Sequence, residues 1–128
     1  MTRRVALLTV LVPDYDAGIE FFCSVLDFEL LEDTALTETK RWVRVAPRGA
    51  ETGLLLAVAD TDAQQARIGD QTGGRVMGFV KTADFAADHA RFSARGLEFM
   101  EAPRHEPYGT VAVFRDPWGN TWDLIEHA

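Results

Sequence analysis

The stretch VAVFRDPWGNTWDLIE, residues 111–126, decides how this chain folds. Residues 109–114, which overlap the start of this stretch, alternate in character as a half-buried β-strand does. Residues Asp116–Asn120 read Asp-Pro-Trp-Gly-Asn and predict a tight turn, because proline fixes one backbone dihedral while glycine and asparagine tolerate the left-handed region. Residues 121–126 then predict a closing strand.

The residues that precede this stretch complete the second half of the chain. An apolar run at 75–80 predicts a strand, and a helix is expected from about Phe85 to Arg95. Phe85 and Phe92 lie seven residues apart on one face of this helix, and Gly96 follows its end as a left-handed residue. The segment LEFME at 97–101 predicts one more strand.

The first half of the chain follows the same order of elements. The apolar run at 4–12 predicts a strand buried on both faces, and Asp14 is placed to cap a helix. That helix carries an apolar stripe at positions i, i+3, i+4 and i+7, formed by Ile19, Phe22, Cys23 and Leu26. Three strands are predicted after it, at 28–32, 41–46 and 53–59.

The two halves are related by a shift of about 68–70 residues, since FELLE at 28–32 reappears as LEFME at 97–101. The sequence therefore predicts an α+β fold made of two βαβββ modules within a single domain, 1–128. Module one covers 1–59 and module two covers 75–128. The polar, glycine-containing segment 60–74 is interpreted as a connector with room for one short helix.

Composition sets limits on function. With 128 residues, 47% of them apolar, the chain can build a core, and its net charge of −7 argues against a nucleic-acid partner, which requires a basic face. No segment approaches the roughly 20 apolar residues that cross a bilayer, so no membrane partner is expected. Cys23 is the single cysteine, which excludes an intramolecular disulfide and a cysteine-based zinc cluster and fits a reducing cytoplasm. Its place on the apolar stripe argues against a nucleophile.

Three segments together resemble the vicinal oxygen chelate superfamily of glyoxalases, extradiol dioxygenases and bleomycin-resistance proteins. They are VPDYDAGIEFFCSVLDFELLED (12–33), ARGLEFMEAP (94–103) and the stretch at 111–126. The resemblance implies an eight-stranded mixed sheet, curved into a cleft, with helices on its outer face. In this family the cleft holds metal, substrate or drug and is usually completed by dimerisation.

The resemblance also implies where a catalytic metal would be bound, at one position on the first and the fourth strand of each module. These positions fall on Leu7, Leu55 (or Ala57), Arg75 and Asp123. Leucine has no lone pair to donate and arginine is a permanent cation, so one carboxylate remains, and neither a metal nor another cofactor is expected. The other possible ligands do not form a site, being scattered in the second helix, a loop and the C-terminus: His89, His105, Glu106 and His127.

Two features of the expected cleft point to ligand binding. Arg75 and Asp123 converge in the family fold, so a pairing is expected that either orients a ligand or merely fills the vacated metal site. Trp42 and Arg44 share one strand face and could stack on a planar ligand, or serve only sheet packing. Leu7, Phe114 and Tyr108 complete the expected ligand-binding set, whereas Trp122, next to Asp123, is predicted to point into the core.

The preferred interpretation is a metal-independent small-molecule binding protein of the bleomycin-resistance type, acting as a cytoplasmic homodimer. The acidic net charge suits a cationic ligand, whereas Arg41, Arg44 and Arg75 suit an anion, so the ligand charge stays open. The alternative is a glyoxalase-like lyase, isomerase or dioxygenase with an atypical or metal-free site, in which Asp123 acts as a general base. A scaffold whose pocket has lost its function is the third possibility.

Overall fold

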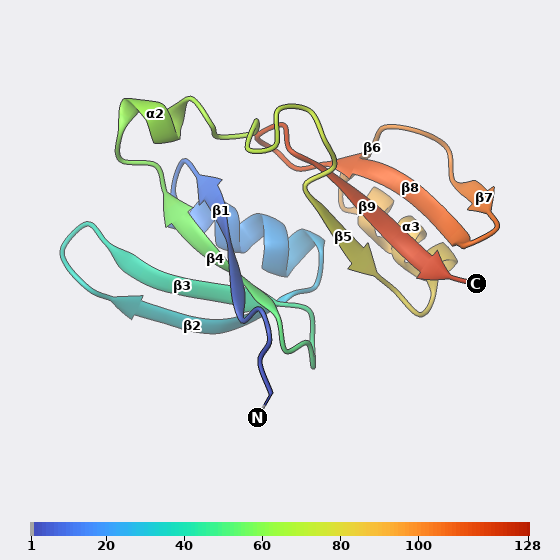
Figure 1. Cartoon of the computed structure of the whole chain (residues 1–128), viewed down its shortest axis with the longest axis horizontal. Helices are drawn as coiled ribbons and strands as arrows, with labels where there is room; N and C mark the ends of the chain where they lie inside the picture. The colour runs from blue at the N-terminus through green and yellow to red at the C-terminus, as the bar shows by residue number, and fades with distance from the viewer. Residues whose placement is uncertain (1) are drawn as a thin grey trace. The chain divides into compact units, whose positions relative to one another are not determined.

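The computed structural model describes residues 2–128 and divides them into two compact units, one ending at Ile68 and the other beginning at Gly69. Each unit has its own sheet and at least one helix, as the predicted α+β class and module repeat require (Figure 1). The predicted connector, 60–74, is divided between the two units and carries the short helix α2 (Asp62–Gln65). Each unit is described by itself below.

The first unit contains a four-stranded sheet in the order β1-β4-β3-β2. Its elements before α2 are β1 (Leu7–Val12), α1 (Tyr15–Ile19), the π-helical segment η1 (Glu20–Val25), β2 (Glu29–Ala35), β3 (Arg41–Ala46) and β4 (Gly53–Val58). β1 runs parallel to β4, while β3 is antiparallel to both β4 and β2. All four strands predicted for module one are therefore present, and β3 has the predicted bounds.

The helix of the first unit begins as predicted and then widens. The side chain of Asp14 accepts a hydrogen bond from the backbone N–H of Ala17 at 2.7 Å, which caps α1. In η1 the helix makes wider π turns, and the N–H of Leu26 donates to the carbonyl of Phe21. Phe21, which the predicted 3.6-residue spacing left off the apolar stripe, is thereby buried next to Phe22.

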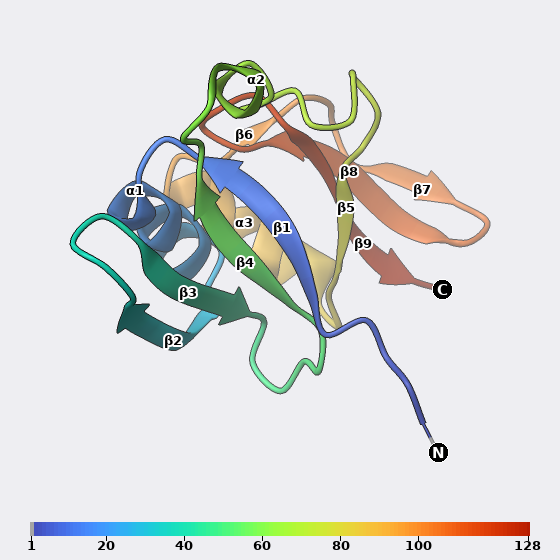
Figure 2. The same cartoon turned by 60° about the vertical axis from the view of Figure 1, so that its left-hand side comes forward.

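Helices cover one face of the first sheet, where α1 contacts β1, β3 and β4 (Figure 2). Val10, Val43 and Val45 are fully buried. Thr9, which points to the opposite face of β1, is exposed. The prediction that this strand is buried on both faces is therefore wrong.

The second unit contains a five-stranded sheet in which β5, β9, β8 and β6 lie in that order and β7 also pairs with β8. Its elements are β5 (Gly78–Lys81), α3 (Phe85–Ala94), β6 (Glu98–Phe99), β7 (Arg104–Glu106), β8 (Gly109–Arg115) and β9 (Thr121–His127). β5 is parallel to β9, and β9 is antiparallel to β8. Asp84 caps α3, and Gly96 beyond its end has a φ of 92°, as predicted.

Two elements of the second unit differ from the sequence prediction. β5 begins at Gly78 and not at Arg75, because the chain still turns through Gly73 and Gly74, which have φ angles of 66° and 103°. His105 and Glu106, expected in a loop, belong to β7, which folds back onto the edge of β8.

The helices are short; α3 has 10 residues. Among residues 2–128, no helix combines the length and apolar character needed to cross a membrane.

Candidate functional site

The Asp116–Asn120 turn fixes the direction of every side chain in β9. Asp116 is 2% exposed, and its Oδ1 accepts three backbone hydrogen bonds, from Trp118, Gly119 and Asn120, at 2.9–3.0 Å. Its second oxygen, Oδ2, accepts the indole N–H of Trp122 at 3.1 Å. The turn thus holds Trp122 on the helix-covered side of the sheet, and alternation places Asp123 on the opposite, helix-free side.

Trp122 is a core residue, as predicted, and Phe114 is one too. Phe114 pairs with Trp122 across β8 and β9, is 0% exposed, and its ring stacks on the indole with 5° between their planes and 6.4 Å between centroids. The same register pairs Val113 with Asp123. Phe114 therefore lies on the face opposite Asp123, and its predicted role in the same ligand site is wrong.

Asp123 lies on the helix-free face of the second sheet, between Phe79 of β5 and Val113 of β8. Its Oδ1 is buried and has no hydrogen-bond partner in the described part of the chain, 2–128. Desolvation raises the pKa of Asp123; the nearby charge of Arg104 opposes this effect and that of Glu101 adds to it. A buried carboxylate oxygen without a donor is costly, so Asp123 has an unmet demand for a hydrogen-bond donor or a proton.

A charged cluster accompanies Asp123, formed by Glu101, Arg104 and Glu106. Arg104 Nε lies 3.1 Å from Glu101 Oε2, and Arg104 Nη1 lies 3.1 Å from Glu106 Oε1. These carboxylates, together with the side chain of Tyr108, raise the pKa of the Arg104 guanidinium above its ordinary value. Of this neighbourhood the sequence prediction named Asp123 and Tyr108 as site residues, and Tyr108 is 52% exposed in the turn between β7 and β8.

Glu101 and Arg104 were missed as site residues although a signal for them existed. In the internal repeat Glu101 corresponds to Glu32, the last residue of FELLE. Glu32 accepts a hydrogen bond from Arg44 at 2.9 Å, so each copy of the repeated glutamate forms an ion pair with an arginine. The repeat could therefore have identified Glu101 as an ion-pair residue, but not its partner.

Arg75 does not pair with Asp123. It is exposed, lies three residues before β5, and its backbone carbonyl accepts hydrogen bonds from the hydroxyls of Thr72 and Thr121. The charges that act on Asp123 are those of Arg104 and Glu101. The expected pairing across the cleft floor is therefore wrong, because Arg75 belongs to the turn before the strand.

The helix caps give the correct equivalence between the modules. Asp14 and Asp84 each cap the helix that follows the first strand of their unit. Leu7 lies seven residues before Asp14, and Met77 lies seven residues before Asp84. Met77, two residues before Phe79, therefore takes the position that the sequence analysis assigned to Arg75.

The helix-free face of the first sheet brings together the other predicted site residues. β1 and β4 place Leu7 opposite Gly53 and Thr9 opposite Leu55, and β3 places Arg44 opposite Leu55. Trp42 lies two residues before Arg44 on the same face of β3, and its side chain is 37% exposed. This face is thus an apolar floor of leucines bordered by an accessible indole and a guanidinium.

The residues at the four family positions do not fit a catalytic metal. Leu7 and Leu55 offer no lone pair, Met77 offers a weakly accepting thioether, and Asp123 alone offers an oxygen. Throughout the described residues 2–128, no group of three or more His, Cys, Asp or Glu side chains is placed to hold a metal ion. Cys23 is half-buried, and desolvation raises the pKa of its thiol, which disfavours a reactive thiolate.

Comparison with known proteins agrees with this architecture. The model of the Glyoxalase/Bleomycin resistance protein/Dioxygenase superfamily matches residues 4–124, and the chain belongs to this family. An uncharacterized protein of Shewanella frigidimarina is 44% identical, with 98% of this chain and 95% of the relative aligned.

Solved structures of the family include TnmS3, an antibiotic-binding protein from Streptomyces sp. CB03234. It is 31% identical to this chain with a TM-score of 0.81, and the alignment covers 99% of this chain and 98% of TnmS3. UcmS2 is 28% identical with a TM-score of 0.84, and 98% of each chain is aligned.

Proposed function

We propose that this protein is a metal-independent small-molecule binding protein that sequesters an antibiotic or metabolite. The observation that carries the proposal is the type of side chain at the positions where the family resemblance implies metal ligands. Leu7, Leu55 and Met77 occupy three of these positions in place of metal-binding side chains. An apolar floor suits the body of an organic ligand better than a coordinated cation. The likeness to the antibiotic-binding TnmS3 supports the same class of function.

The ligand we propose is planar and either neutral or cationic. Trp42 offers an exposed indole for stacking, beside Leu7 and Leu55. Arg44, which lies on the same strand face as Trp42, already has a carboxylate partner in Glu32. An anionic ligand on this face would have to displace the Glu32 carboxylate.

The proposal is tested by metal content and by ligand-induced stabilisation. Purified protein is expected to contain less than stoichiometric divalent metal by elemental analysis, and EDTA should leave its thermal midpoint unchanged. A screen of planar antibiotics should contain compounds that raise the midpoint, because a ligand that binds the native state stabilises it. Trp42→Ala should remove that shift, while Leu30→Ala, a truncation on the opposite face of the first sheet, should retain it. One bound metal per chain would overturn the proposal.

A metal-free enzyme is the second candidate, and one observation favours it. The raised pKa of Asp123 and its unpartnered oxygen are properties of a general acid or base. The two candidates differ in the fate of the ligand: a binding protein returns it unchanged, as mass spectrometry of the released compound would record. Conversion that disappears in Asp123→Asn while binding persists would favour the enzyme.

We further propose that the protein acts in the cytoplasm as a homodimer. Exposed apolar side chains on the outermost strands of both sheets support a second copy as partner: Phe79 of β5 is 69% exposed and Leu8 of β1 is 56% exposed.

A further inference from the structure

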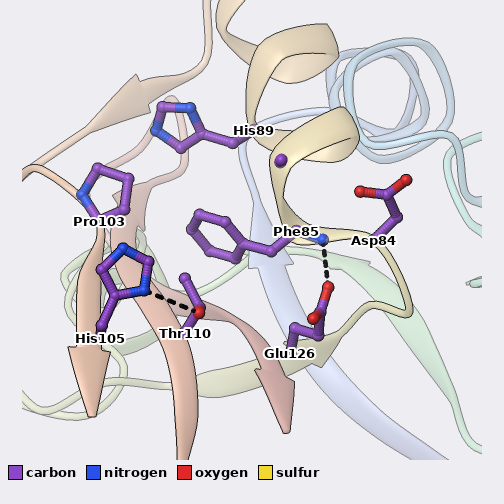
Figure 3. A pocket seen from close by; sticks show the side chains of 8 residues that line it. Asp84, Phe85, His89, Pro103, His105, Thr110 and Glu126 are labelled. Atoms are coloured by element: carbon purple, nitrogen blue, oxygen red, sulfur yellow. Dashed lines mark hydrogen bonds between the residues drawn. The ribbon is translucent and has the colours of Figure 1, made fainter. Parts of the chain in front are cut away.

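A second pocket lies in the second unit, on the face of β9 opposite Asp123. It has a volume of about 490 Å³ and is bordered by Asp84, Phe85, His89, Pro103, His105 and Glu126. Figure 3 shows these side chains around the N-terminal end of α3, with the Phe85 ring directed toward the centre. A volume of this size accommodates a small organic ligand.

Alternation in β9 separates this pocket from the proposed binding face. Glu126 lies four residues after Trp122 and shares its helix-covered side, whereas Asp123 points away from it. Thr110 pairs with Glu126 across β8 and β9, and His105 pairs with Thr110 across β7 and β8. The pocket is thus formed between the N-terminal end of α3 and the strands β7, β8 and β9.

The two carboxylates of the pocket are acceptors, and each is held by a hydrogen bond from a backbone N–H of α3. Glu126 Oε1 accepts the backbone N–H of Phe85 at 2.7 Å, and Asp84 Oδ1 accepts the backbone N–H of Ala87 at 3.1 Å. Each of these bonds uses one oxygen of its carboxylate. His105 Nδ1 lies 3.2 Å from the Thr110 hydroxyl, which orients the imidazole ring.

The charge of the pocket selects its ligand. Two carboxylates border it, and none of its lining residues, all within the described chain, is a lysine or an arginine. An anion would meet uncompensated negative charge there. A cation would gain charge-assisted hydrogen bonds from the second oxygens of Asp84 and Glu126.

The remaining wall is aromatic and apolar. His89 stacks on Phe85 with 5.6 Å between ring centroids and lies 4.2 Å from the centroid of Phe99. These two rings hold the His89 side chain half-buried. Phe85, His89 and Pro103 together form an aromatic and apolar surface beside the two carboxylates.

We propose that this pocket is a second binding site, for an organic ammonium ion with a small aromatic or apolar body. The ammonium group binds between Asp84 and Glu126, and the body of the ligand packs against Phe85 and Pro103. This site is independent of the proposed function, since it occupies the other face of the sheet.

Benzylamine, benzyl alcohol and benzoate are matched probes, since they share a ring and differ in charge. In ¹⁵N-correlated NMR titrations of the full chain, benzylamine should shift the amide signals of Phe85, His105 and Glu126, and bind at least tenfold more tightly than the alcohol. Benzoate should leave these signals unchanged. Equal shifts from benzoate, no shift from benzylamine, or shifts centred on Asp123 would each overturn the proposal.

Two variants remove charge and keep the acceptor that each helix bond requires. Glu126→Gln retains an oxygen for the Phe85 N–H, and Asp84→Asn retains a capping oxygen. Each should weaken benzylamine binding by about tenfold, the effect of losing one charge-assisted hydrogen bond. Asp70→Asn, which removes an exposed carboxylate that does not border the pocket, should leave the affinity unchanged. The double variant, Asp84→Asn with Glu126→Gln, should lose more affinity than either single variant, and unaltered affinity in the folded double variant would contradict the proposal. If the double variant does not fold, the three probes on the wild-type protein decide the proposal.

Discussion

Asp123 combines three properties at one residue: a central strand position, a buried oxygen and no donor within residues 2–128 for that oxygen. Desolvation raises its pKa above the ordinary value of 3.8. Because the folded-state pKa exceeds the unfolded one, the native state binds the proton more tightly. Protonation of Asp123 therefore contributes stability that is complete below the unfolded pKa and is lost as the pH rises through the folded pKa.

Replacement of Asp123 by asparagine tests this linkage. The variant should have a larger free energy of unfolding than the wild type at pH 7, because it removes a desolvated charge. The difference should shrink as the pH falls through the raised folded-state pKa of the wild-type carboxyl, because that carboxyl then becomes protonated. Urea unfolding at several pH values measures it, with the exposed Asp70→Asn as a control. A constant difference across that range would show that the carboxyl is not linked to folding in this way.

Asp116 is the residue on which the geometry of the site depends. Asp116→Ala leaves three backbone N–H groups and the Trp122 indole without their acceptor, and we expect it to lower the free energy of unfolding by about 3–5 kcal/mol. Asp116→Asn keeps one acceptor oxygen for the backbone and should lose less, about 1–2 kcal/mol. Chemical denaturation compares the two. Equal losses would mean that the backbone hydrogen bonds contribute little.

At the scale of elements, the hairpin that joins β7 and β8 depends on a glycine. Gly109 has a φ of 149°, and a Cβ built on it would lie 2.1 Å from the carbonyl oxygen of Glu126. Gly109→Ala should therefore lower the free energy of unfolding by roughly 3 kcal/mol or more, since backbone must move to accept the methyl group. Gly96→Ala, with a φ of 92° and open space around the new Cβ, should cost only about 1 kcal/mol. Thermal unfolding of both variants provides the comparison, and similar losses would contradict the steric argument.

The elements that the sequence predicts correctly are those set by local patterns. Alternation placed β3 at Arg41–Ala46, and the same rule separated Trp122 from Asp123. The start of β5 was misplaced because the turn through Gly73 and Gly74 continues into the first residues of the apolar run 75–80.

The parts of the site that the sequence did not predict depend on contacts between distant segments. β7 is a strand because it pairs with β8, so nothing within Arg104–Glu106 itself required one. The ion pairs of Arg104 follow from that register, and they supply the charge near Asp123 that the prediction assigned to Arg75. Local pattern thus gave the fold and the position of Asp123, whereas its charged neighbour required the tertiary structure.

At the scale of the whole molecule, the proposed homodimer would bury apolar side chains that are exposed to solvent in a single chain. Phe79 is 69% exposed, and it lies on β5, the outermost strand of its sheet. Sedimentation at micromolar concentration should give twice the mass of one chain. Phe79→Ser should shift this equilibrium toward single chains, because it removes apolar area that dimerisation would bury.

Leu36→Ser is the matched control, since Leu36 is 58% exposed and lies in the turn between β2 and β3, outside both β1 and β5. It removes a similar exposed side chain and should leave the measured mass unchanged. A single-chain mass for the wild type at every concentration would contradict the dimer. An equal loss of dimer in Phe79→Ser and Leu36→Ser would contradict a dimer contact at β5. Retention of planar ligands by a stable single chain would mean that binding requires no second copy.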